Sequence, residues 1–88
     1  MPGQSAAIKD DGWERRAALD RALLAAHADA DGLTLAALYA DASDLSEAAG
    51  DIDAAAFYMT HAYVFALETG HPMADAFHAR LLALGREE

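Results

Sequence analysis

The sequence GDIDAAAFYMTHAYVFALETGHP occupies residues 50–72 and carries no Asp, Glu, Lys or Arg between Asp53 and Glu68. Its opening Gly-Asp is typical of a turn followed by a helix N-cap, and Gly70 is typical of the residue at which a helix ends. The segment between them is rich in alanine and aromatic residues and contains no proline. We therefore expect a helix over about 52–68 that is nearly free of charge.

Composition favours helices in the rest of the chain. Twenty-four alanines and eleven leucines occur against two prolines, and β-branched residues are few, so helix is favoured over sheet. The turn signals are Asp29-Ala-Asp-Gly32, Gly50 and Pro72, and Pro72 is expected at the first position of the last helix. The predicted fold class is all-α, a small four-helix array or two tandem helical hairpins, with antiparallel helices over about 12–28, 33–49, 52–68 and 72–84.

The predicted domain covers residues 11–86, and residues 1–10 are expected to form a disordered tail. Asp11 with Glu14 three residues later resembles a capping box, so the first helix is expected to begin just after Asp11. A chain of 88 residues can hold one domain with a modest core. We therefore expect a single helical domain.

The net charge of −9 is distributed unevenly along the chain. All six basic residues lie near the ends, and residues 22–79 contain nine acids and no Lys or Arg. An acidic field repels phosphates and anionic lipids, so we expect no nucleic-acid partner and no membrane partner. The same field could attract a basic protein, or it could simply keep an apolar domain soluble.

Several function classes are disfavoured by what the sequence lacks. Without cysteine there is no disulfide, no thiolate metal site and no thiol nucleophile. The sequence has no nucleophile elbow, no phosphate-binding glycine loop and no zinc-protease helix, so we expect no enzyme, no catalytic residue and no cofactor. The first residues have neither the basic start nor the apolar run of a signal peptide, and the expected location is the cytoplasm.

The predicted helix over 52–68 has two apolar faces. One face consists mostly of alanines with Met59, which lets a neighbouring backbone approach closely, and the other is large and mostly aromatic. A helix that is apolar on all sides must be covered on all sides, either by the other three helices or by another chain. Ordinary core packing is the alternative to a binding surface for the large face. The predicted partner-binding residues are Tyr39, Phe57, Tyr58, His61, Val64 and Phe65.

After the turn at Gly50-Asp51, small residues occur at Ala55 and Ala62, and Pro72 follows the next helix. In these features residues 33–72 resemble a tetratricopeptide-type repeat, which carries small residues in its second helix and ends at a proline. Ser43 and Met59 replace the glycine and the bulky aromatic residue of the repeat, the tryptophan-like start is missing, and the proline comes several residues late.

This resemblance implies that the chain binds protein, because such repeats usually present a surface to a peptide or a partner domain. A gapless shift of 38 residues pairs Gly32 with Gly70 and Tyr39 with Phe77, as in two degenerate hairpins in tandem. Two hairpins are fewer than the roughly three repeats of a stable stack, so self-association would complete the burial. The expected partner is a protein, specifically a second copy in a homodimer.

Two other functions are compatible with the sequence. An acidic inhibitor or mimic could engage a basic partner through acids of the second and third helices, namely Asp41, Asp44, Glu47, Asp51 and Asp53. A metal-binding helical bundle could use His71, Asp75 and His78, which are spaced i, i+4, i+7 along one side of the last predicted helix. The alternative for these three side chains is a solvated polar end of that helix.

Overall fold

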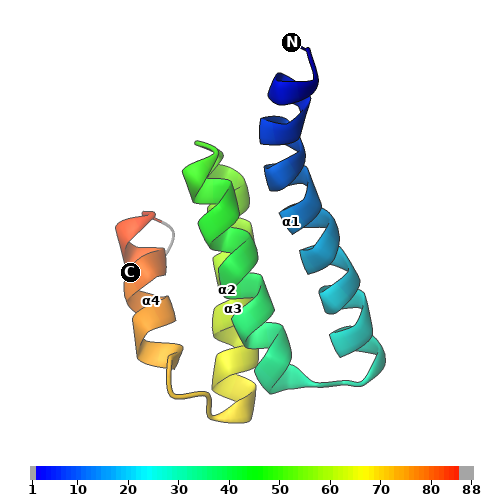
Figure 1. The fold of residues 1–88 in the computed structure, drawn as a ribbon. Coiled ribbons are helices and arrows are strands. Elements are labelled where there is room, and N and C mark those ends of the chain that lie inside the picture. Colours follow the sequence, from blue (N-terminus) through cyan, green and yellow to red (C-terminus); the bar gives the residue numbers. More distant parts are fainter. Residues whose placement is uncertain (1, 86–88) are drawn as a thin grey trace.

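The computed structural model describes the backbone of residues 2–85 and the side chains of residues 14–85. The fold is all-α, as predicted, and this part of the chain contains no strand. The chain reverses direction at each connection between successive helices (Figure 1). The four helices are α1 (Pro2–Ala28), α2 (Gly32–Ala48), α3 (Ile52–Thr69) and α4 (Ala74–Ala83).

The first helix begins earlier than expected. Residues 2–10, expected to form a disordered tail, continue α1 to Pro2, so the predicted start near residue 12 is wrong. Proline is tolerated at the first helical position because its missing N–H has no partner there, and no later proline interrupts the helix. The capping-box pattern at Asp11 and Glu14 therefore lies inside a helix. The N-terminal turns of α1 extend beyond the ends of the other helices (Figure 1). Met1 and residue 86 lie outside the described residues.

The two central helices agree with prediction to within one residue at each end. The Asp31 carboxylate accepts the Thr34 N–H at 3.2 Å and the Thr34 hydroxyl at 2.6 Å, which caps α2. Asp51 caps α3 in the same way, because its carboxylate accepts the Ala54 N–H at 3.1 Å. Gly70 ends α3 in the left-handed conformation, with φ of 67°. These capping residues satisfy backbone groups that a helix end would otherwise leave unpaired.

The last helix begins two residues later than expected. Pro72 lies in the turn before α4 rather than at its first position, and Met73 is the N-cap residue. The Met73 N–H donates to the His71 ring Nδ1 at 3.0 Å, and the Ala74 N–H donates to the His71 carbonyl at 3.2 Å. The turn is thus closed around His71, and this delays the start of the helix.

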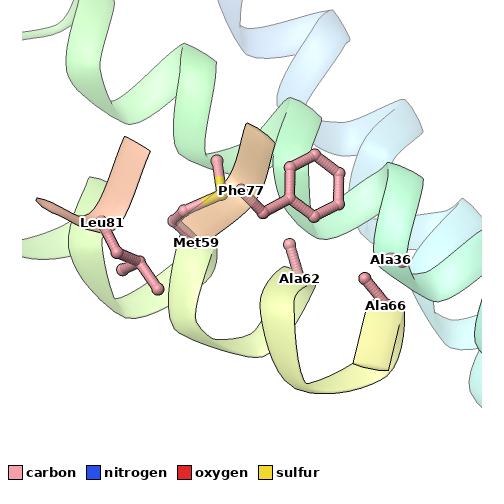
Figure 2. Close-up of a cluster of buried hydrophobic side chains, with 6 residues drawn as sticks. All are labelled: Ala36, Met59, Ala62, Ala66, Phe77 and Leu81. Carbon is pink, nitrogen blue, oxygen red and sulfur yellow. The ribbon is translucent and has the colours of Figure 1, made fainter. Parts of the chain in front are cut away.

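The core lies where α2, α3 and α4 meet. Its fully buried members are mostly small, and Figure 2 shows Phe77 and Leu81 of α4 beside Met59 of α3. Between α2 and α3, the buried Ser43 hydroxyl donates to the Ala55 carbonyl at 2.7 Å. Only small side chains lie between the two helices there, so their backbones can approach closely enough for this bond to form. The core cluster consists of Ala36, Met59, Ala62, Ala66, Phe77 and Leu81.

α1 packs less closely than the other helices. Ala26 is its one buried side chain among residues 14–28, and Leu19 and Leu23 are half-buried. A groove of about 420 Å³ runs between α1 and α2, with Arg15 at its α1 side and Asp41 and Asp44 at its α2 side. α1 packs mainly against α2. None of the helices in residues 2–85 combines the length and apolar character needed to cross a membrane.

Candidate protein-interaction surface

α3 presents opposite faces to the core and to solvent. Ala55, Ala62 and Met59 on its small face are buried, and Met59 is only 1% exposed. Phe57, two residues earlier in the helix, is 57% exposed, and Val64 is 45% exposed. The other helices therefore do not wrap α3, and its large face is open in the single chain. We call the exposed residues Phe57, Val64 and Leu67, with the half-buried His61 and Phe65 beside them, the α3 outer face.

Aromatic rings join the α3 outer face to α2. Tyr39 of α2 lies at the centre, stacked on Tyr58 at 6.2 Å and on Phe65 at 5.9 Å between ring centroids. His61 lies 5.0 Å from the Tyr39 ring and 4.6 Å from the Phe57 ring. All four of these α3 side chains thus belong to one contiguous aromatic cluster. Such contacts hold the rings in fixed positions and favour a preformed surface.

The ring of His61 is fixed by a hydrogen bond to its own helix. Its Nδ1 lies 2.9 Å from the Phe57 carbonyl oxygen. A carbonyl oxygen can only accept, so Nδ1 carries the proton. In the neutral imidazole the other nitrogen, Nε2, is then a hydrogen-bond acceptor. The α3 outer face therefore includes one polar acceptor among apolar side chains.

Two shallow hollows flank the centre of the α3 outer face. A hollow of about 410 Å³ lies beside Phe57 and includes Asp53. The other, about 310 Å³, lies beside Val64 and His61 and includes Glu68. Thr60 borders both. The surface is therefore a line of apolar side chains with an acid near each end.

The six predicted binding residues fall into two groups. Tyr39, Tyr58, His61 and Phe65 are half-buried members of the aromatic cluster. Phe57 is an exposed member of it, and Val64 is exposed beside it. Substituting Tyr58 would disturb its stacking on Tyr39, so Phe57 is the cleaner position at which to test binding.

Sequence reasoning missed two contributors to this region. Leu67 is 58% exposed, and its position three residues after Val64 was a usable signal. His27 of α1 also contributes. Its ring Nε2 lies 2.9 Å from the Tyr39 hydroxyl, and its ring lies 6.1 Å from that of Phe65. No local pattern indicates this contact, which depends on how α1 packs.

The acids proposed for an acidic mimic are largely engaged within the chain. Arg80 of α4 donates to Asp44 at 2.9 Å and to Glu47 at 2.7 Å. The hydrogen bond to Asp44 is the main cause that raises the pKa of Arg80. Asp51 caps α3, and partial burial raises the pKa of Asp41, with the charge of Asp44 as a second cause. These acids are therefore less available to a partner than the sequence indicates.

Two of the three side chains proposed for a metal site, His71 and His78, are engaged elsewhere. The His71 ring accepts the Met73 N–H and lies 5.8 Å from Phe77, and the His78 ring stacks on Tyr63 at 5.2 Å. Within the described residues, no group of three or more His, Asp or Glu side chains is arranged to hold a metal ion. Asp75 is exposed in the first turn of α4.

The small residues of the tetratricopeptide-like interpretation lie between α2 and α3. Ala55 and Ala62 are fully buried, and Ser43, at the position of the repeat's glycine, is also fully buried. The resemblance itself stays a prediction, and so does the protein-binding function that it implies. No family model, curated protein or solved structure matches this chain.

Proposed function

We propose that this chain is a small helical protein-interaction module and that the α3 outer face is its binding surface. The observation that carries the proposal is the exposed fraction of Phe57, 57%, beside the 1% of Met59 two residues later. Contiguous exposed apolar side chains in a small protein are typical of sites that bind another macromolecule. Aromatic residues are also enriched at the centres of protein interfaces, where Lys and Glu are depleted.

The aromatic cluster supports binding rather than chemistry. The cluster consists of rings stacked on one another, and its histidine Nδ1 is committed to a backbone carbonyl. We assign no catalytic residue and no cofactor to it. A cytoplasmic setting is part of the proposal, because a chain without cysteine is compatible with a reducing compartment.

Two occupants fit an exposed helix face of this kind. One is a second copy of the chain, the homodimer expected from the sequence. The other is an amphipathic helix of a different protein. Both make the same prediction for Phe57, because either would cover that side chain.

The test combines self-association with binding of model helices. Sedimentation velocity at several concentrations reports self-association, and fluorescence anisotropy reports binding of labelled amphipathic helical peptides of either charge. We expect at least one form of binding by the wild type, lost in Phe57→Asp and retained in Leu82→Asp. Leu82, on α4, is the control because it is also a large, exposed apolar side chain, at 44%, and lies outside the α3 outer face. A wild type that neither associates nor binds any of the peptides would falsify the proposal.

A further inference from the structure

We infer that the occupant of the α3 outer face is a basic amphipathic helix of another protein, about four turns long, with Lys or Arg near both ends. This inference rests on the proposed function and adds the chemistry of the partner. It is carried by the shape of the α3 outer face and by the sign and position of the charges around it.

The shape of the surface favours a helix as the partner. Phe57, His61 and Val64 are spaced i, i+4, i+7, which places them along one stripe of α3. The two hollows lie along the same stripe and are separated by Thr60. Apolar side chains spaced by one turn on a partner helix can enter such hollows, as ridges enter grooves in helix packing.

The two acids at the ends of the stripe set the length of the partner. Asp53 and Glu68 are fifteen residues apart, the difference between their numbers, and both are exposed. At about 1.5 Å per residue this separation is roughly 22 Å. A partner helix of about 16 residues reaches from one acid to the other, with its apolar residues between them.

The charges select a basic helix over a second copy. In an antiparallel pair of α3 helices, Asp53 would lie near Glu68 of the second copy, and in a parallel pair each acid would lie near its own equivalent. Both orientations bring like charges together, and the net charge of −9 per chain adds to the repulsion. A helix with basic residues at both ends instead pairs opposite charges at both positions.

The centre of the surface adds one hydrogen-bond acceptor to this pattern. With Nδ1 of His61 donating to the Phe57 carbonyl, Nε2 of the neutral ring can accept a hydrogen bond. A partner that places an N–H or O–H donor at the middle of its apolar stripe would satisfy this nitrogen.

The experiment uses the full chain and three synthetic peptides of about 16 residues. The first has leucines at i, i+3, i+4, i+7 and i+11 and lysines near both ends. The second keeps the leucines and replaces every lysine by glutamate. The third has the composition of the first in a scrambled order that has no apolar face. Each peptide is titrated by fluorescence anisotropy into wild type, Phe57→Asp and Leu82→Asp, at low and at high salt.

We expect the basic amphipathic peptide to bind at least tenfold more tightly than either of the other two. Phe57→Asp should weaken that binding at least tenfold, and Leu82→Asp should leave it within twofold. The preference over the acidic peptide should shrink at high salt, because exposed charges are screened. Replacing both Asp53 and Glu68 by Asn and Gln should remove most of the preference without removing binding.

Four results overturn the inference. The basic and acidic peptides could bind the wild type equally and both fail to bind Phe57→Asp. That result would support the interaction surface but contradict its preference for a basic partner. Self-association that depends on Phe57, with no peptide binding, makes the second copy the occupant. If the scrambled and the amphipathic basic peptides bind equally, binding depends only on the net charge of the chain and not on an apolar helix face. Absence of all binding and of self-association removes the proposed function as well.

Discussion

Met59 and Phe57 differ by two positions in α3, and truncating each to alanine tests the division of that helix into a core face and an open face. Met59 is 1% exposed and packs in the core cluster, so Met59→Ala removes a fully buried side chain and leaves a cavity. Such substitutions cost about 2–5 kcal/mol in free energy of unfolding. The whole chain is expected to be stable by on the order of 4–13 kcal/mol, from typical values per residue. Met59→Ala should therefore remove a large part of the stability.

Phe57→Ala should cost much less, although phenylalanine is the larger side chain. Fully burying a phenylalanine is worth roughly 1.5–3 kcal/mol. Phe57 is 57% exposed, so somewhat less than half of that, about 0.6–1.3 kcal/mol, is at stake. Alanine is also the better helix former, by about 0.5 kcal/mol. The net cost should be about 0–1 kcal/mol.

The assay is urea unfolding followed by circular dichroism, at a concentration where light scattering finds the wild type monomeric. Free energies extrapolated to water and slopes with urea are compared among the wild type and the two variants. A Phe57→Ala cost equal to or larger than the Met59→Ala cost would show that Phe57 is buried in the monomer, and the argument for an open face would then be wrong.

Three further perturbations test local features of the fold. Gly70→Ala should destabilise by about 1–2 kcal/mol in thermal or urea unfolding, because φ of 67° is costly for a residue with a Cβ, and an unchanged midpoint would contradict the left-handed end of α3. Arg80→Gln removes two exposed ion pairs to α2 and should cost only roughly 0.2–1 kcal/mol, less at high salt, so a larger loss measured by urea unfolding would count against a surface role. Hydrogen bonds from Thr34 lower the pKa of Asp31, so the folded chain holds this proton less tightly than the unfolded chain. The stability that Asp31 contributes is then present above its unfolded pKa, about 3.9, and is lost as the pH falls through the lower folded value. Urea midpoints of wild type and Asp31→Asn should converge over that acidic range, and a constant difference down to about pH 2 would contradict the assignment.

Features that depend on neighbours in sequence were predictable, and features that depend on packing were less so. Asp51 and Gly70 act on backbone groups within a few residues, so the ends of α3 follow from local capping. The two faces of α3 follow from helical periodicity. The face of small residues is buried, and the large face carries the exposed Phe57 and Val64.

The start of α1 and the start of α4 were missed for related reasons. At Asp11 a plausible capping pattern was given more weight than the uninterrupted run of helix-compatible residues before it. At Pro72 the usual preference for the first helical position was overridden by the ring of His71, which accepts the Met73 N–H. The contact between His27 and Tyr39 could not be predicted, because it joins two helices whose relative placement is a tertiary property.

The close packing of α2 on α3 also sets an order in which the chain should open. These two helices share the buried Ser43 hydroxyl bond and most of the fully buried alanines. By contrast, residues 14–28 of α1 contribute one buried side chain, and α4 is only ten residues long. In native-state hydrogen exchange, the amides of α2 and α3 should be protected nearly to the limit of global unfolding. The amides of α1 and α4 should exchange through detachment of a single outer helix, with the inner pair intact.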